Sequence, residues 1–126
     1  MIRVAAGLFV IAHGLVHLLY LISKPDDPSW PFTLRQSWLL PEDVRRPVAL
    51  VLLSLVVTAF VLLGLAVWGF PGLSGIWPGI ATVSALLSLG LLVAFWNAQL
   101  GAGVCIDIAL IVLAVVHPGW IDKVVG

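Results

Sequence analysis

The sequence predicts an all-α membrane protein, a four-helix bundle that crosses the bilayer up-down-up-down and forms one domain over residues 1–126. Three observations favour this fold class. Hydrophobic residues make up 62% of the chain and charged residues 10%, and the mean hydropathy is +1.19. So short a chain cannot bury that much apolar surface in one soluble core, so lipid is expected to cover the rest. The second observation is four long apolar segments, and the third is the short turns between them.

The four apolar segments are predicted to be the membrane spans, because about 20 apolar residues cross about 30 Å of hydrocarbon as a helix. They cover residues 4–22, 48–70, 76–96 and 101–117. The fourth is short and contains an acidic residue. The first is too long for a signal peptide and no small-residue cleavage site follows it, so we expect it to remain in the mature protein.

The connections between the segments predict how the helices alternate. "GFPGLSG" and "NAQLGAG" are short and contain glycine, which favours antiparallel neighbours. Residues 23–47 contain five prolines and are predicted to form a long loop between the first two helices. Trp30 and Trp38 in this loop are expected at the level of the lipid headgroups.

Charge and cysteine content exclude several classes of protein. The net charge is zero and no basic run is present, which argues against nucleic-acid binding. Cys105 is the only cysteine, so an intrachain disulfide and a cysteine metal cluster are excluded. We expect Cys105 to be a buried, small apolar residue. The expected location is a cell membrane, crossed several times, and specifically a prokaryotic plasma membrane.

The first span carries a polar stripe. His13 and His17 lie four residues apart, on one helical face, and Tyr20 continues that face. Polar side chains at membrane depth face the bundle interior, because lipid offers them no partner. We therefore expect both imidazoles to point inward, while Gly14, on an adjacent face, permits another helix to approach closely.

Asp107 in the fourth span needs a partner, because an isolated aspartate near a helix centre costs about 3 kcal/mol. Counting at about 1.5 Å per residue from the ends of the spans places His17 at the depth of Asp107. We therefore predict that these two residues interact directly or through one water molecule. Ser54 and Ser88 are expected at a similar level, where their hydroxyls would complete a polar pocket.

Three interpretations of this pocket remain open. In the first, His17 and Asp107 bond each other, and His13 bonds a carbonyl or a serine, only to hold the helices together. In the second, His13, His17 and Asp107 bind a divalent metal as a set of two histidines and one carboxylate. In the third, these residues and Tyr20 form a path for protons or a substrate.

Some motifs are shared with other membrane proteins. Arg3, Gly7, "HGLVH" at residues 13–17 and "FWNAQLGAG" before the last span resemble a group of small bacterial four-helix membrane proteins with no assigned activity. In size and layout the chain is similar to DoxX-like proteins. That resemblance implies an accessory role in membrane redox chemistry, and it carries no catalytic residue over to this sequence.

These observations favour a small-ligand-binding or accessory membrane subunit with a polar intramembrane pocket. A component of a small oligomeric transporter or channel is the first alternative, and a metal-dependent membrane enzyme is the second. Whether the protein is an enzyme stays open. The expected partners are the lipid bilayer and either further copies of the chain or a larger membrane complex.

Overall fold

The computed structural model describes residues 2–21, 39–96 and 100–125, and within these ranges the chain is helical and has no strand. Short 3-10 turns, labelled η, join or extend the α-helices. The elements are α1 (Ile2–Val16), η1 (His17–Leu21), α2 (Glu42–Val67), η2 (Ser74–Ile76), α3 (Trp77–Ala94), α4 (Gly101–Val116) and η4 (Ile121–Lys123).

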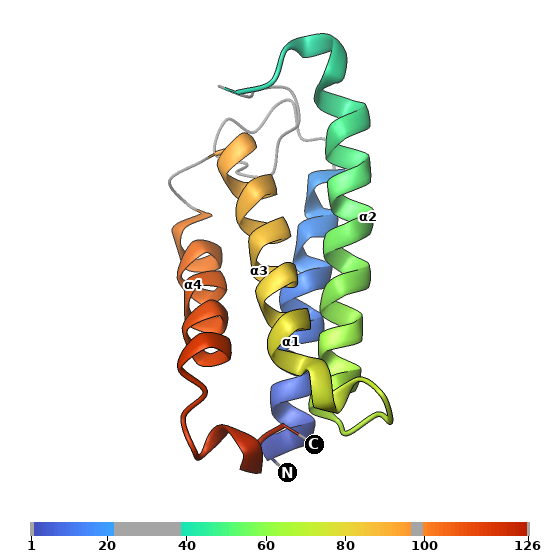
Figure 1. The fold of residues 1–126 in the computed structure, drawn as a ribbon. Coiled ribbons are helices and arrows are strands. Elements are labelled where there is room, and N and C mark those ends of the chain that lie inside the picture. The colour runs from blue at the N-terminus through green and yellow to red at the C-terminus, as the bar shows by residue number, and fades with distance from the viewer. Residues whose placement is uncertain (1, 22–38, 97–99, 126) are drawn as a thin grey trace.

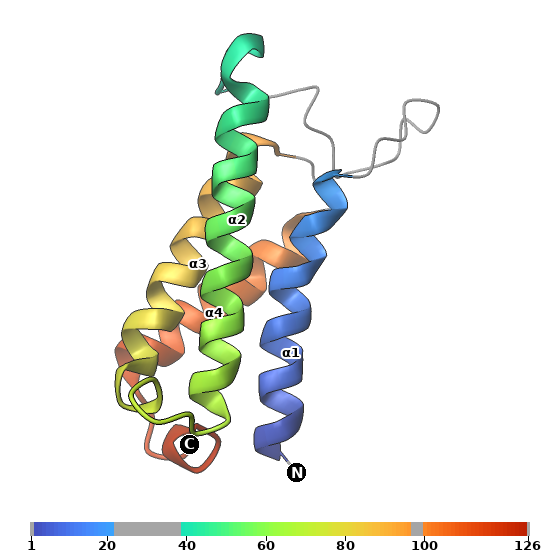
Figure 2. The same ribbon diagram turned by 90° about the vertical axis from the view of Figure 1, so that its right-hand side faces the viewer.

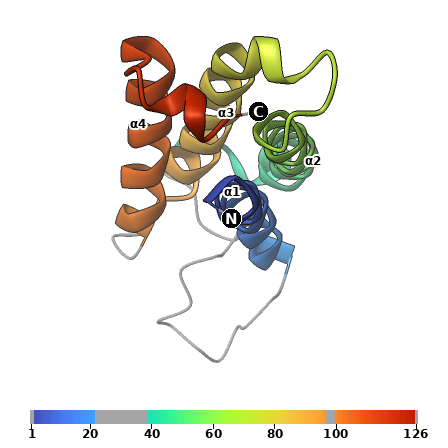
Figure 3. The same ribbon diagram turned by 90° about the horizontal axis from the view of Figure 1, so that it is seen from below.

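The helices pack in chain order: α1 on α2, α2 on α3 and α3 on α4. Figure 1 shows them side by side, and in Figure 2 α2 lies between α3 and α1. The view from below in Figure 3 places α4 on the outside, beside α3 and far from α2. No comparable interface joins α1 to α4 in the described part of the chain.

Contacts at the helix ends relate their directions. The indole N–H of Trp68, which follows α2, donates a hydrogen bond to the carbonyl of Val4 over 3.3 Å, so α2 ends where α1 begins. The rings of Trp77 and His117 lie 5.4 Å apart, so α3 begins where α4 ends. His117 ends α4 in the left-handed conformation, with φ of 48°.

Three helices are long and apolar enough to cross a membrane: Ile2–Tyr20, Glu42–Val67 and Ser74–Ala94. The sequence predicted four such spans. The fourth helix is apolar, but its 16 residues make it shorter than the other three. Many large apolar side chains face outward on all four helices, among them Leu8, Val51, Val83 and Val115. The outer surface of the four described helices is therefore rich in apolar side chains.

The second helix begins at Glu42, and not at residue 48 as predicted. Pro41 precedes it in an extended conformation, and Glu42 and Asp43 place negative charge in the first turn, where the helix dipole favours it. Pro47 lies inside α2, in its second turn, where the missing N–H removes one backbone hydrogen bond from the helix. Most of the predicted loop, including Trp30 and Trp38, lies outside the described residues.

The turn between α2 and α3 requires glycine at two positions. Gly69 and Gly72 have φ of 85° and 84°, a backbone conformation that other residues rarely adopt. The predicted turn that contains glycine is therefore confirmed in this part of "GFPGLSG". In the second predicted turn, residues 97–99 lie outside the described part of the chain.

Glycines bring α1 and α2 close together. A Cβ atom on Gly14 would overlap the Cβ of Phe60, and one on Gly64 would overlap the side chain of Ile11. The predicted close approach of another helix at Gly14 is thus confirmed, and that helix is α2. The interface between α1 and α2 has no room for an added methyl group at Gly14 or Gly64.

We expect Gly14→Ala to lower the free energy of unfolding by about 1–3 kcal/mol, because overpacking forces the two backbones apart. Thermal unfolding in detergent, followed by circular dichroism, measures this change. Gly90→Ala in α3 is the matched control, since a Cβ there meets no atom within 4 Å. It should be neutral or stabilising, and equal stability of the two variants would contradict the packing argument.

Candidate functional site

Four buried polar residues meet in the apolar interior. His13 is 8% exposed, His17 1%, and Ser88 and Asp107 are both fully buried. They come from α1, η1, α3 and α4 respectively. Only one other buried polar residue occurs in the described ranges, Ser84, whose hydroxyl bonds the carbonyl of Ile80 in its own helix.

The carboxylate of Asp107 is the centre of this cluster. His13 Nε2 lies 2.9 Å from Asp107 Oδ1, and Ser88 Oγ lies 2.5 Å from Asp107 Oδ2. His17 Nε2 lies 2.8 Å from Ser88 Oγ. Asp107 therefore holds α4 to α1 through one oxygen and to α3 through the other, and Ser88 connects it to His17.

The predicted direct contact between His17 and Asp107 is wrong. Asp107 bonds His13, and it reaches His17 only through Ser88. The depth count assumed that the ends of the first and fourth spans lie in one plane. A displacement of one helical turn, about 5.4 Å, is enough to pair Asp107 with the histidine four residues earlier.

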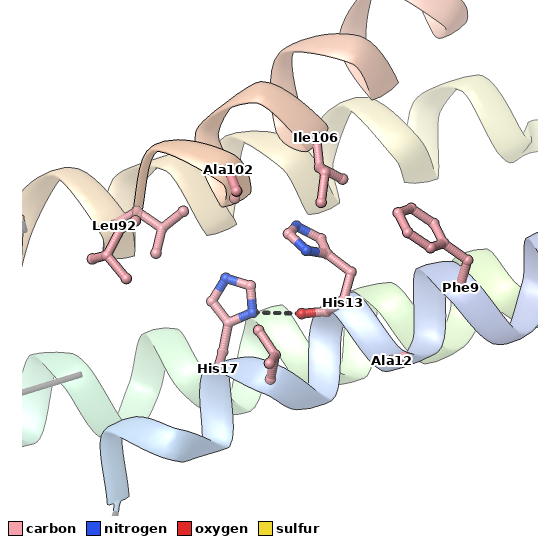
Figure 4. A pocket seen from close by; sticks show the side chains of 10 residues that line it. Phe9, Ala12, His13, His17, Leu92, Ala102 and Ile106 are labelled. Atoms are coloured by element: carbon pink, nitrogen blue, oxygen red, sulfur yellow. Dashed lines mark hydrogen bonds between the residues drawn. The ribbon is translucent and has the colours of Figure 1, made fainter. Parts of the chain in front are cut away.

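Phe60 of α2 supports both imidazoles. Its ring lies edge to face with His13 at 5.0 Å between centroids and is stacked with His17 at 6.2 Å. The ring fits there because Gly14 has no side chain. His17 Nδ1 is held by two carbonyls of its own helix, those of His13 at 3.0 Å and Gly14 at 3.2 Å. Figure 4 shows the first of these bonds.

The hydrogen bonds restrict where protons can be. His17 Nδ1 carries a proton, because its partners are carbonyls, which only accept. Ser88 has one hydroxyl proton but bonds both His17 and Asp107. In one complete arrangement, Asp107 is ionised, Ser88 donates to it, and a doubly protonated His17 donates to Ser88. In the other, a protonated Asp107 donates to Ser88, which donates to a neutral His17.

Both arrangements contain the same number of protons and leave His17 and Asp107 together without net charge, as a low-dielectric interior favours. They differ by two proton transfers, from His17 to Ser88 and from Ser88 to Asp107. In both, His13 Nε2 donates to Asp107, so His13 Nδ1 holds a lone pair. The cluster can therefore move a proton internally and accept a hydrogen bond at His13.

A cavity of about 340 Å³ opens on the histidine side of the cluster. Its wall comes from α1, η1, the end of α3 and the beginning of α4, and apart from His13 and His17 it is apolar. Figure 4 shows both rings directed from the first helix into the space below Ala102 and Ile106.

His13 Nδ1 has no hydrogen-bond partner among the described residues, and none of their fully buried side-chain nitrogens or oxygens lacks one. This atom is therefore accessible from the cavity. The other ring nitrogen, Nε2, is held by Asp107, so the bond to the carboxylate fixes the orientation of the imidazole.

Three other predicted residues lie elsewhere. The buried Tyr20 donates to the carbonyl of Phe95 over 3.4 Å, at the end of α3. Ser54 is exposed and donates to Leu50 in its own helix, so its predicted place in the pocket is wrong, because that face of α2 points outward. Cys105 was expected to be buried but is exposed. The face of α4 that carries Asp107 points inward, and the face that carries Cys105 points outward.

The predicted metal site is not supported by the geometry. No group of three or more histidine, cysteine, aspartate or glutamate side chains in the described ranges is arranged to hold a metal ion. His17 uses Nε2 for Ser88 and Nδ1 for backbone carbonyls, so neither nitrogen is free to be a ligand. His13 and Asp107 bond each other and do not converge on a third point.

Two features of the site were missed from the sequence. Phe60 was not connected with the histidines, although a large aromatic residue and a glycine on neighbouring helices are a common packing pair. The cavity was also missed, because it results from the sparse packing between α1 and α4 in the described ranges, which no sequence motif indicates.

Comparisons of the chain with protein-family models, with curated proteins and with solved structures found no match. The resemblance to DoxX-like proteins stays a prediction. Function must therefore be argued from the site itself.

We expect Ser88→Ala to reduce the free energy of unfolding by about 1–3 kcal/mol, because it leaves His17 Nε2 and Asp107 Oδ2 buried without this partner. Thermal unfolding in detergent measures the loss. Ser54→Ala is the matched control, because its hydroxyl is exposed, and should change stability by about 0.5 kcal/mol or less. Equal effects of the two substitutions would show that the buried network is not a major source of stability.

Proposed function

We propose that the protein is an integral membrane protein whose four helices cross the bilayer up-down-up-down, and that it binds a small molecule at His13. Three helices of sufficient length and apolar character support the membrane part, and so does the alternation of helix directions visible in Figure 1. The long loop between α1 and α2 belongs to the proposal as well. The ligand carries an O–H or N–H group that donates to His13 Nδ1.

One observation carries the binding proposal. His13 Nδ1 is accessible from an otherwise apolar cavity, while Nε2 of the same ring is bonded to the carboxylate of Asp107. A purely structural cluster would need the bonds among His13, Ser88 and Asp107, but it would not need a cavity beside them. The volume of about 340 Å³ is within the range of small-molecule sites, roughly 300–1,000 Å³. Apolar walls with one or two polar groups are typical of such sites.

A second candidate function is that of a subunit in a proton-coupled transporter. The two proton arrangements of His17, Ser88 and Asp107 support it, because their exchange moves a proton from η1 to α4 without creating net charge. Such hydrogen-bonded chains occur in proton relays of membrane pumps and transporters. A chain of this size would need further copies or a larger complex to build a complete pathway across the bilayer.

Phenol and anisole test the binding proposal, because they share one ring and only phenol donates a hydrogen bond. The chain contains three histidines, so ¹⁵N-histidine labelling in detergent micelles gives few imidazole signals. We expect phenol to shift the His13 Nδ1 signal saturably, and anisole to leave it unchanged. His117, which is exposed and bonded to Asp122, is an internal reference for non-specific effects.

His13→Gln assigns the responding signal and should abolish it. Equal responses to phenol and anisole, or a shift at His117 as large as that at His13, would refute the proposed site. Phenol was chosen as a probe of the site's chemistry and is not itself the expected biological ligand.

Proton flux into liposomes tests the transporter candidate. Vesicles containing the protein, driven by a potassium diffusion potential with valinomycin, should acidify faster than empty vesicles. Ser88→Ala should reduce the flux to that of empty vesicles, because it removes the hydroxyl between His17 and Asp107. Ser54→Ala should retain the flux of the parent, and a parent flux no greater than that of empty vesicles would exclude this function.

A further inference from the structure

A second cavity lies next to the first along α1 and α4. Its volume is about 410 Å³, and Phe9 and Ile106 line both cavities. Its wall is formed by apolar side chains of α1, α2, α3, α4 and the chain that follows α4. We call the two cavities together the groove: they lie along α1 and α4 and share Phe9 and Ile106 in their walls, with His13 at one end and Ile2 at the other.

We propose that this groove binds a single-chain amphiphile with a hydroxyl head, and that the hydroxyl donates to His13 Nδ1 while the hydrocarbon chain occupies the second cavity. This inference rests on the proposed binding function and specifies the class of ligand. The two requirements come from different residues: the accessible acceptor belongs to the first cavity, whereas the second cavity is lined only by apolar side chains.

The dimensions favour an elongated ligand. His13 and Ile2 are eleven residues apart on α1, which corresponds to about 16 Å along the helix at about 1.5 Å per residue. A compact molecule at His13 would fill only the first cavity. A chain that displaces the side chains of Phe9 and Ile106, which line both cavities, would reach the second cavity and bury its methylene groups there.

The dimensions also argue against a helix of a second copy as the occupant. A helix is about 10 Å across with its side chains, so 16 Å of it occupies on the order of 1,000 Å³. That exceeds the volume of the two cavities taken together, 340 and 410 Å³. Moreover, a transmembrane helix from another copy would have to bring a hydrogen-bond donor to the level of His13.

Addition of an alkyl chain to the phenol probe tests the inference. We expect 4-octylphenol to shift the His13 Nδ1 signal at a concentration, expressed per detergent molecule, at least tenfold lower than phenol. Expressing concentration in this way removes the general preference of longer chains for the micelle. The methyl ether 4-octylanisole should leave His13 Nδ1 unchanged, because it has the same chain but no donor.

Ala109→Phe should abolish the tenfold gain, because Ala109 lines the second cavity and the larger ring would fill it. Its affinity for phenol should not change, which also shows that the variant is folded. Ile108→Phe is the control, since Ile108 is exposed and lines neither cavity. Ala6→Leu fills the same cavity from α1 and replaces Ala109→Phe if that variant does not fold.

The outcomes separate the two proposals. Binding of phenol without any gain from the octyl chain, or a gain that both filling variants retain, overturns the inference and leaves the proposed function intact. Failure of both phenol and 4-octylphenol to move the His13 signal overturns the proposed function itself.

Discussion

The need to satisfy one buried carboxylate determines how three of the four helices meet. Asp107 has no exposed surface, and an unpaired aspartate in an apolar interior is strongly destabilising. Its two oxygens bond residues from different helices, His13 of α1 and Ser88 of α3. In the part of the chain that the structure describes, the extensive interface of the fourth helix is with α3, so the bond to His13 is the specific contact that sets its rotation toward α1. Hydrogen bonds of this kind are an important source of specificity between apolar helices in membranes, because apolar side chains pack about equally well against lipid.

The position of that bond depends on packing against the adjacent face of α1. Gly14 allows Phe60 to lie against the helix, and the Phe60 ring contacts both imidazoles from behind. The carbonyls of His13 and Gly14 hold the ring of His17, which leaves Nε2 directed at Ser88. The rotamers of the polar residues are thus determined by a glycine and a phenylalanine. The residues that stabilise the fold are therefore the same ones that orient the site, so few substitutions here can affect one property alone.

The sequence predicted the helical fold and the buried polar residues more accurately than their partners. Composition predicted the apolar helices, and the spacing of His13 and His17 predicted their shared inward face, because both follow from local periodicity. The pairing of Asp107 was wrong, since it depends on the relative heights and rotations of helices, which residue counting does not contain. Ser54 shows the same limit: its depth was considered, but its direction around α2 was not. The beginning of α2 was placed too late because Pro47 was read as ending a loop, whereas the helix begins at Glu42 and continues through Pro47.

The open side between α1 and α4 also determines the route by which a ligand would arrive. The walls of the groove are apolar apart from His13 and His17, and the groove runs along α1 from His13 to Ile2. In a bilayer, a molecule would therefore reach His13 by diffusing sideways among the lipids, in two dimensions. Occupancy would then follow the mole fraction of the ligand in the membrane, and its concentration in water would matter only through its partition into lipid. Adding more lipid at a constant amount of ligand would empty the site by dilution, even though the aqueous volume had not changed.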